Sequence, residues 1–489
     1  MKTIIYNIGT LAGILPADVR KLEGTQMNHV ECIENAYLVI EDGIIAEFGK
    51  MSDSVILNGT KDPVILNGTK NPVILNGTKD PVILNGTKWS EESLGERSFA
   101  DAQDDKNGAQ EDKNGTQEDK NGAQEDKNGA LKEKNGTQDE NIEYIDAEGG
   151  FVMPCFCDSH THIVYAGCRD GEFRDKIAGL SYEEIAARGG GILNSADLLH
   201  ETSEDELYRQ AMERVEEIMA MGTGAVEIKS GYGLTVEDEL KMLRVIKRIK
   251  ETAPITVKAN FLGAHAVGRA YRGRQSEYVD LVCEEMLPKV AEEGLADFVD
   301  VFCDTGFFTV EETARILEKA AKYGIRPKIH ANELEVSGGV QVGVKYNALS
   351  VDHLEKTTEA EIEALRGSET MPTMLPGCSF FLGIPFGNAK GYIEAGLPVA
   401  LASDYNPGSS PSGNMRFVMA LGCIRMRLTP EQSFNACTIN SAYAMGVSCE
   451  LGSITLGKKA NLIITKPIPS LAFIPYSHQT PIIKKVIIS

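Results

Sequence analysis

Two histidines one residue apart, His160 and His162, end a hydrophobic run and have the spacing of metal ligands. The run Phe151–Phe156 is typical of a buried strand, and it leads into the sequence Asp-Ser-His-Thr-His. Because successive side chains on a strand point to opposite faces, the two imidazoles share one face, about 6–7 Å apart. At that separation they can close on one metal ion. The pattern alone is a weak signal, since short motifs produce false positives and polar packing is the simpler alternative.

Three further ligand-type residues, His330, His353 and Asp404, each end another apolar run. A single histidine in such a place is more often a hydrogen-bonded polar residue. Together with His160 and His162, however, His330 and His353 make up four of the eight histidines of the chain. Nitrogen and carboxylate ligands without cysteine suit Zn²⁺ or Fe²⁺, with one open position for water. Such an ion lowers the pKa of a bound water toward neutrality, and Asp404 could both bind the ion and accept the water's proton.

The segments that carry these residues alternate with amphipathic helical patterns. The expected strands are Phe151–His162, Ala225–Ser230, Ile255–Leu262, Phe298–Cys303, Pro327–His330, Ala348–His353, Thr370–Leu375 and Pro398–Asp404. Helical patterns lie between most of them, for example at Ser203–Met221, Val236–Glu251, Ser276–Glu293 and Val310–Tyr323. This alternation predicts an α/β fold, a (β/α)8 TIM-type barrel. Such barrels place their reacting groups where the strands end.

Both ends of the chain predict short strands rather than helices. Residues 36–45 contain an Asp42-Gly43 hairpin turn, and apolar strand patterns recur at 453–465 and 481–488. We therefore expect a small split β-sandwich domain formed by both termini. Its parts are residues 1–50, the return segment 141–150 and residues 446–489, and the barrel takes residues 151–445.

Residues 51–140 contain two short repeats. VILNGTK recurs with a nine-residue period from Val55 to Lys88, and a seven-residue repeat close to KNGAQED runs from Lys106 to about Lys134. The second repeat is polar and rich in Gly and Asn, so it cannot bury a core. The Asn-Gly-Thr triplets match a glycosylation acceptor, although repeat expansion explains them more simply. We expect a disordered insertion without a catalytic role.

Composition limits the partners and the compartment. The chain has 489 residues and a net charge of -22, which disfavours nucleic acid or an anionic membrane as a partner. Its ten cysteines have no disulfide-like spacing, which suits a reducing cytosol. The first residues lack a convincing signal peptide, and no run reaches the roughly 18 apolar residues of a membrane span. These features predict a cytoplasmic protein that acts on a small molecule.

The order of the ligand-type residues resembles that of the metal-dependent amidohydrolase superfamily. Closer similarity is to the imidazolonepropionases, in the segments EIKSGYGL (227–234), FLGAHA (261–266), KIHANE (328–333), SVDHLE (350–355), LPGCSFFL (375–382) and SDYNPGSSP (403–411). The resemblance covers residues 1–50 and 141–489. It implies hydrolysis of the cyclic amide of 4-imidazolone-5-propanoate to N-formimidoyl-L-glutamate in histidine degradation. It also implies one Zn²⁺ or Fe ion per subunit and a homodimer.

The resemblance also implies roles for individual residues. His160, His162, His330 and Asp404 would hold the metal ion. Glu333, His353 and Asp404 would be catalytic, as proton carriers or by polarising the carbonyl. The substrate would contact Arg169, Tyr232, His265, Glu333, Asn406, Gly408 and Ser409. Read without the family, Arg169 could be a structural ion pair, Glu333 a helix-start acid and the 406–409 loop an ordinary turn.

Other functions fit the same ligand pattern. Another cyclic amidohydrolase, or an aminohydrolase such as a guanine deaminase, would use the same metal ligands. Arg169, Tyr232 and the loop from Asn406 to Ser409 favour the imidazolonepropionase reaction. A non-catalytic barrel assembly protein is a further alternative, but such a protein is expected to lose metal ligands, and none is missing here. The sequence leaves open the choice between Zn and Fe and the group that protonates the leaving nitrogen.

Overall fold

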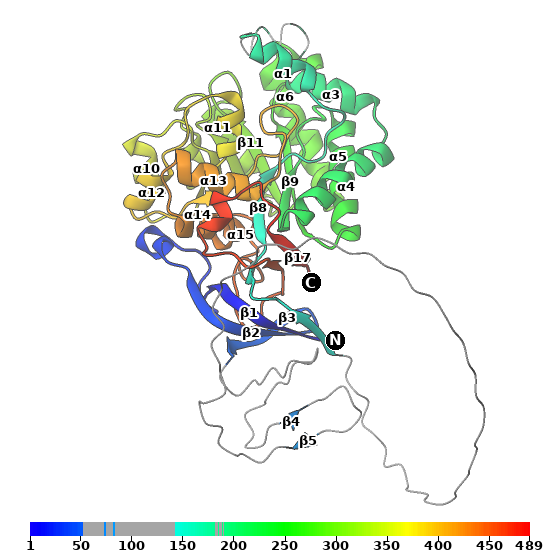
Figure 1. Cartoon of the computed structure of the whole chain (residues 1–489). Coiled ribbons are helices and arrows are strands. Elements are labelled where there is room, and N and C mark those ends of the chain that lie inside the picture. Colours follow the sequence, from blue (N-terminus) through cyan, green and yellow to red (C-terminus); the bar gives the residue numbers. More distant parts are fainter. Residues whose placement is uncertain (52–72, 75–81, 84–141, 181–183, 185–187, 189) are drawn as a thin grey trace, which may run out of the picture. The chain divides into compact units, whose positions relative to one another are not determined.

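The computed structural model describes residues 1–51, 73–74, 82–83, 142–180, 184, 188 and 190–489 (Figure 1). Two compact units are formed, one by residues 1–51 and 142–489 and the other by residues 52–141. In the second unit the described strands β4, Val73–Ile74, and β5, Val82–Ile83, pair antiparallel. The disorder expected of residues 51–140 stays a prediction, because these positions, apart from Met51 and the two short strands, lie outside the described residues.

A parallel eight-stranded sheet forms the barrel, as predicted. Its strands follow one another in chain order: β8 Phe156–Thr161, β9 Thr223–Lys229, β10 Thr256–Ala264, β11 Phe298–Cys303, β12 Arg326–Ala331, β13 Ser350–His353, β14 Met371–Met374 and β15 Ala400–Leu401. The two ends of the sheet meet where the Asp404 N–H donates to the His160 carbonyl at 3.0 Å, and the His162 N–H to the Tyr405 carbonyl at 2.8 Å. These bonds bring the first and last strands together, so the His-x-His and Asp404 lie side by side.

Helices surround the barrel (Figure 1). Their bounds are α1 Asp170–Ile177, α3 Ile192–Glu201, α4 Glu204–Ala220, α5 Val236–Thr252, η3 Arg269–Tyr271, α6 Gln275–Leu281, η4 Val282–Met286, α7 Leu287–Glu292, α8 Val310–Ala321, α9 Gly339–Lys345, α10 Glu359–Leu365, α11 Pro376–Leu382, α12 Ala389–Glu394, α13 Met415–Arg425, α14 Pro430–Cys437, α15 Ile439–Ala444 and α16 Phe473–Tyr476. The helix expected over 276–293 is divided into α6, a π-helical turn η4 and α7.

Local sequence explains where the long helices begin. The side chains of Ser203 and Thr235 accept hydrogen bonds from backbone N–H groups in the first turns of α4 and α5. Thr309 and Glu312 form a reciprocal capping box at the start of α8. Each such cap contributes about 1 kcal/mol, because it satisfies backbone donors that have no partner inside the helix. These helices then bury their apolar faces against the barrel strands.

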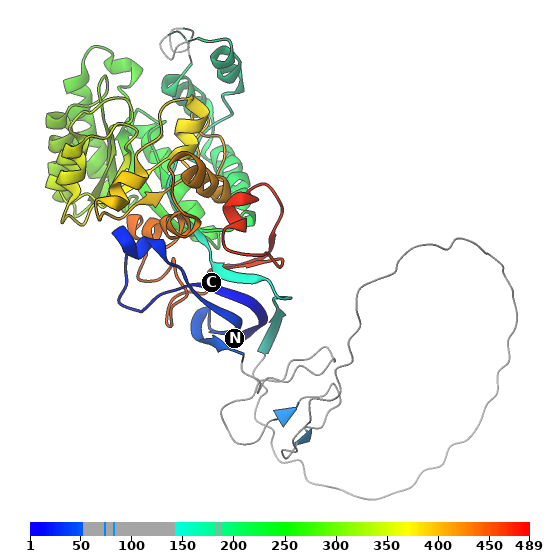
Figure 2. The ribbon, with the colours of Figure 1, turned by 60° about the vertical axis from the view of Figure 1, so that its left-hand side comes forward.

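The termini form one seven-stranded sheet (Figure 2). Its strands are β1 Lys2–Ile14, β2 Glu31–Glu41, β3 Ile44–Lys50, β6 Ile142–Asp146, β7 Phe151–Pro154, β16 Leu462–Thr465 and β17 Ile483–Ile487, and the short helix η1, Gly24–Asn28, lies between β1 and β2. The path β17-β16-β7-β1-β2-β3 interleaves the two ends of the chain, which confirms the predicted terminal β domain. Asp42 and Gly43 both have positive φ in the β2–β3 hairpin, as the expected turn requires.

Two expected strands differ from the observed ones. The run 151–162 is two strands, because β7 ends at Pro154 and pairs with β1 and β16 in the terminal sheet, whereas β8 begins at Phe156 in the barrel. The strand expected over 398–404 is regular only at Ala400–Leu401, since the chain bends to place Asp404 at φ 55°.

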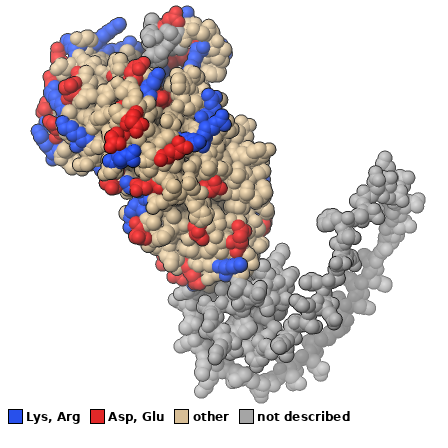
Figure 3. All heavy atoms as spheres, turned by 90° about the vertical axis from the view of Figure 1, so that its left-hand side faces the viewer, with Lys and Arg blue, Asp and Glu red and all other residues tan. Residues whose placement is uncertain are grey.

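On the face drawn in Figure 3, acidic and basic side chains are interspersed. Among the described helices, none has the length and apolar character needed to cross a bilayer.

Candidate metal centre and active site

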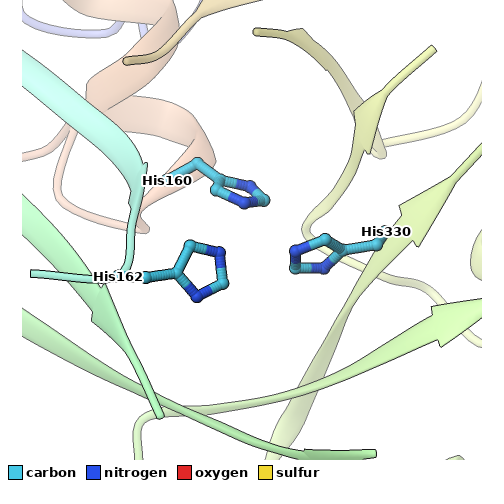
Figure 4. Close-up of side chains that lie close together, drawn as sticks. All are labelled: His160, His162 and His330. Carbon is cyan, nitrogen blue, oxygen red and sulfur yellow. The ribbon is translucent and has the colours of Figure 1, made fainter. Parts of the chain in front are cut away.

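Three histidine rings face one another at the carboxyl ends of the barrel strands (Figure 4). His160 and His162 lie at the end of β8, and His330 lies in β12. Ring centroids are 4.5 Å apart for His160 and His330, and 5.3 Å apart for His160 and His162. One potential ligand atom from each residue lies within 4.8 Å of the others, and all three side chains are buried. The strands therefore converge three imidazoles on one point.

Asp404 completes this group. Its Oδ1 lies 3.6 Å from Nε2 of His160 and 3.6 Å from Nε2 of His162. Within the described part of the chain, Nε2 of His160, Nδ1 of His162 and both ring nitrogens of His330 are buried and have no hydrogen-bond partner. Buried polar atoms without partners are costly, and a cation held among them would satisfy their lone pairs. The donor set of three nitrogens and one carboxylate thus fits a single Zn²⁺ or Fe²⁺ ion.

Two aspartates that the sequence analysis did not identify lie beside His160 and His330, and the first forms a hydrogen bond that orients its histidine. Nδ1 of His160 lies 2.7 Å from Oδ2 of Asp352, and Nδ1 of His330 lies 3.1 Å from Oδ1 of Asp300. A proton held on Nδ1 by a carboxylate leaves the lone pair on Nε2, the nitrogen that would bind a metal. The available signal was an acidic residue inside an otherwise apolar run, as in FVDVFC and SVDH.

Beneath the histidines, five charged side chains form a buried lattice of Glu227, Lys229, Asp300, Lys328 and Asp352, none of them more than 1% exposed. Nζ of Lys229 donates to Glu227 at 2.6 Å and to Asp300 at 2.7 Å, and Nζ of Lys328 donates to Glu227 at 2.5 Å. Burial alone would lower the pKa of Lys229, but the carboxylates of Asp300 and Glu227 outweigh burial and raise it. Removing one member would leave a buried charge unpaired, which costs about 3–5 kcal/mol.

Glu333 and His353 form a second polar pair at the site. Nε2 of His353 lies 3.4 Å from Oε2 of Glu333, and its Nδ1 lies 3.5 Å from Oε2 of Glu355. Burial raises the pKa of Glu333 to about 7, and the nearby Glu355 and Asp404 add to this rise, against the opposing charge of His353. Burial would lower the pKa of His353, but the two glutamates raise it to about 10. A carboxyl whose pKa lies near 7 can both take and give a proton at neutral pH.

Arg169 and the loop after Asp404 lie against each other. A Cβ placed on Gly408 would clash with Nη1 of Arg169, so the glycine lets the guanidinium lie directly against the loop. The side chain of Arg169 is 8% exposed and also pairs with Glu172 at 2.9 Å. Oδ1 of Asn406 accepts from the N–H groups of Gly408 and Ser409, both at 2.8 Å. The loop is thereby held rigid beside the guanidinium.

The same loop touches the fourth expected metal ligand. Oγ of Ser409 lies 3.2 Å from Oδ2 of Asp404 and also receives a hydrogen bond from the Asn406 amide at 2.7 Å. Asp404 therefore has one oxygen toward the histidines and the other toward the loop. This arrangement joins the candidate metal centre to the candidate substrate loop through a single carboxylate.

Tyr232 and His265 line the site on the side of His162. The rings of His162 and His265 stack with centroids 5.3 Å apart and an interplanar angle of 16°. Tyr232 lies 5.8 Å from His162 and 5.5 Å from His265, measured between ring centroids. Nδ1 of His265 is fixed by the Gly231 carbonyl at 3.0 Å. The structure thus brings all the candidate site residues of the sequence analysis to one end of the barrel.

Comparison with known proteins agrees with this geometry. The amidohydrolase family model matches residues 151–489. An imidazolonepropionase from Flavobacterium johnsoniae is 48% identical over 488 residues, 100% of this chain and 99% of that protein. One from Christiangramia forsetii is 56% identical over 345 residues, 71% of this chain and 84% of that protein.

Solved structures show the same fold at low identity. Guanine deaminase from E. coli has a TM-score of 0.60 at 12% identity, covering 100% of this chain and 97% of that one. An adenosine deaminase from Xanthomonas campestris with bound Zn has a TM-score of 0.59 at 13% identity, covering 99% of this chain and 91% of that one. The family model and the imidazolonepropionase relatives show that the chain belongs to the imidazolonepropionase family of the amidohydrolases.

Proposed function

We propose that this chain hydrolyses the cyclic amide of 4-imidazolone-5-propanoate to N-formimidoyl-L-glutamate, a step of histidine degradation. Relatives of that name are 46–56% identical to it. The observation that carries the proposal is the guanidinium of Arg169 packed against Gly408, four residues from Asp404. A carboxylate-binding fork beside a metal centre suits a cyclic amide that bears a propionate.

The candidate ligands His160, His162, His330 and Asp404 would hold one Zn²⁺ or Fe ion per subunit. The buried Nε2 atoms without partners support this assignment. Such an ion, when bound, polarises the ring carbonyl and lowers the pKa of water toward neutrality. The hydrogen bond to Asp352 would keep the Nδ1 proton of His160, so that its Nε2 stays free of a proton. Asp300 accepts from the backbone N–H of His330 and lies 3.1 Å from its Nδ1.

Residues of this chain would carry out the proton transfers of the reaction. Asp404 accepts a proton from the attacking water while its second oxygen is held by Ser409. As the water oxygen bonds to the carbonyl carbon, His353 stabilises the negative charge on the carbonyl oxygen, and its raised pKa keeps it cationic for this task. The carbon–nitrogen bond then breaks, and Glu333 delivers a proton to the departing ring nitrogen.

Binding of the substrate falls to residues at the rim. Arg169 would pair with the propionate in a bidentate geometry. Tyr232 and His265 would contact the ring, since their side chains lie against His162. The loop formed by Asn406, Gly408 and Ser409 would hold the polar edge of the substrate and later the product.

The remaining organisation is also a proposal. We assign residues 1–50, 141–150 and 446–489 to the terminal β domain, 151–445 to the catalytic barrel and 51–140 to an insertion outside the reaction. The ten cysteines are all free thiols, which supports a reducing compartment such as the cytoplasm. A homodimer is expected from the family alone, and light scattering of the purified chain would measure it.

The proposed reaction is tested by offering purified protein freshly prepared imidazolone propionate and following the loss of the ring's ultraviolet absorbance. We expect turnover that a chelator abolishes and that added Zn²⁺ or Fe²⁺ restores. Guanine serves as the comparison substrate. Consumption of guanine without loss of imidazolone propionate would favour an aminohydrolase, and purified protein that never retains metal would favour an assembly protein.

A further inference from the structure

A second group of ligand-type atoms lies beside the candidate metal centre. It consists of Glu333, His353 and Cys378, whose potential ligand atoms lie within 4.8 Å of one another. Sγ of Cys378 is 3.9 Å from Oε1 of Glu333, and Nε2 of His353 is 3.4 Å from Oε2 of Glu333. The His353 and Cys378 residues are buried, and the Glu333 side chain is 13% exposed. Cys378 lies in α11 and has no part in the proposed reaction.

We propose that Glu333, His353 and Cys378 form a second cation site, which takes a thiophilic divalent ion such as Zn²⁺ or Cd²⁺, and that its occupation inhibits hydrolysis. One sulfur, one nitrogen and one oxygen form a ligand set typical of borderline and soft cations. Tetrahedral bonds of about 2.0–2.3 Å place neighbouring ligand atoms about 3.3–3.8 Å apart. Nε2 of His353 lies within this range of Oε2 of Glu333, at 3.4 Å, and Sγ of Cys378 lies 3.9 Å from the other oxygen, Oε1, so the carboxylate lies between the two other ligands.

The orientation of His353 supports a ligand role. Its Nδ1 faces Glu355, a carboxylate that is itself anchored by the Ser379 hydroxyl at 2.9 Å. With a proton on Nδ1, the lone pair of Nε2 points toward Glu333 and the proposed ion. The contact is a charge interaction at 3.5 Å, unlike the 2.7 Å hydrogen bond between Asp352 and His160.

The surrounding charge also favours a cation. Three carboxylates, Glu333, Glu355 and Asp404, act on His353, and Oε2 of Glu355 is buried without a hydrogen-bond partner among the described residues. A second positive ion would offset their mutual repulsion. Its entry forms bonds to Sγ of Cys378, Nε2 of His353 and the Glu333 carboxylate, so that the S–H proton of Cys378, the Nε2 proton of the cationic His353 and any proton on Glu333 pass to solvent. The partly exposed Glu333 offers the route of entry.

The inhibitory part rests on the proposed function. In that reaction Glu333 delivers a proton and His353 stabilises the carbonyl oxygen. An ion bound to both residues would displace the protons with which Glu333 and His353 perform these tasks. Inhibition by excess metal would therefore arise from a site separate from the one that supports activity.

The test uses the full chain loaded with one equivalent of Zn²⁺ and titrated with Cd²⁺. Cadmium bound to a thiolate gives a charge-transfer band in the ultraviolet. We expect a saturable band of one equivalent in the unaltered protein, which Cys378→Ser abolishes. Cys283→Ser is the matched control, because Cys283 is also buried but lies in η4. Glu333→Gln keeps the thiol and should shift the band to at least tenfold higher Cd²⁺ concentration.

Each outcome decides the proposal. A band of equal size in Cys378→Ser would place the ion on other thiols, such as the exposed Cys168 and Cys449, and would overturn the second site. The Zn²⁺ concentration that halves the rate of hydrolysis should be at least tenfold higher in Cys378→Ser than in the Cys283→Ser control. Equal inhibition in the two variants would overturn the inhibitory role. The Cd²⁺ band is measured without substrate, so it tests the second site even if the proposed hydrolysis is not observed.

Discussion

Nδ1 of His160 lies 2.7 Å from Oδ2 of Asp352, and neither side chain is exposed to solvent. This contact fixes the ring orientation and the tautomer of a candidate metal ligand. Asp352 is also 3.6 Å from Nζ of Lys229 and 3.7 Å from Nζ of Lys328. The Asp352 carboxylate therefore links the metal centre to the buried charges beneath it. Its replacement should change metal binding rather than substrate binding.

Asp352→Asn should weaken metal binding about 10–100-fold, because an amide cannot hold the Nδ1 proton of His160 as a carboxylate does. Competition with a chromophoric chelator measures this affinity directly. Asp205→Asn is a suitable control, since the Asp205 side chain is 88% exposed. Unchanged metal affinity in a folded Asp352→Asn variant would contradict the role of this contact.

Glu333→Gln should lower kcat about 100-fold or more with a smaller change in KM, since the amide cannot deliver a proton. The raised pKa of Glu333, about 7, sets the expected pH dependence. Because the acid form donates the proton, activity of the unaltered protein should fall as the pH rises through this value. That limb of the kcat/KM profile should be missing in the variant, and its persistence would assign the proton to another group.

The positions of the metal ligands could be predicted from sequence because they depend on a general property of barrels. His162, His330 and Asp404 each follow an apolar run, and parallel strands bring their carboxyl ends to one rim. The buried lattice could not be predicted in this way. Its contacts, such as that of Lys328 with Glu227, join residues 101 positions apart, and no local pattern records which buried charges meet.

Two strand boundaries differ from the sequence prediction, and each difference has a physical cause. Pro154 ends β7, so a continuous apolar run serves two sheets, and hydrophobicity alone does not mark the division. Asp404 takes a left-handed backbone conformation, φ 55°, which is uncommon for a residue other than glycine and here has tertiary support. That support is the hydrogen bond from its N–H to His160, a residue far away in the chain.

Arg169→Ala should mainly raise KM, because the guanidinium would bind the propionate and takes no part in bond breaking. Arg169→Lys should recover only part of the loss, since an ammonium cannot form the two parallel hydrogen bonds of a guanidinium. Steady-state kinetics on imidazolone propionate separates kcat from KM. An unchanged KM in both variants would leave Arg169 as a structural partner of Glu172.

His162→Ala should abolish both metal retention and turnover, because it removes one of the four proposed ligands and disrupts the arrangement that would hold the ion. Elemental analysis of the purified variant measures the metal, and the absorbance assay measures turnover. Retained full activity would exclude His162 as a ligand. His29→Ala controls for loss of a histidine, since the His29 side chain is 75% exposed and pairs only with Glu31 among the ion pairs of the described chain.

Lys458 gives a prediction about stability that is independent of the active site. Burial lowers its pKa from 10.5 to about 8, while its Nζ donates to the Leu451 carbonyl and the Ser453 hydroxyl. Between pH 8 and 10.5 the unfolded chain therefore binds more protons at this residue than the folded chain. Stability from this group should rise with pH through that window, because folding no longer requires burial of a charge.

Replacing the side chain isolates this contribution from other groups that titrate in the same range. Thermal unfolding of the unaltered protein and of Lys458→Met should be compared at several pH values from 7 to 10.5. The difference in unfolding temperature between the two should change steadily in favour of the unaltered protein as the pH rises, since only that protein loses a buried charge. A difference that stays constant across the window would mean that Lys458 has the same proton affinity in the folded and unfolded chain.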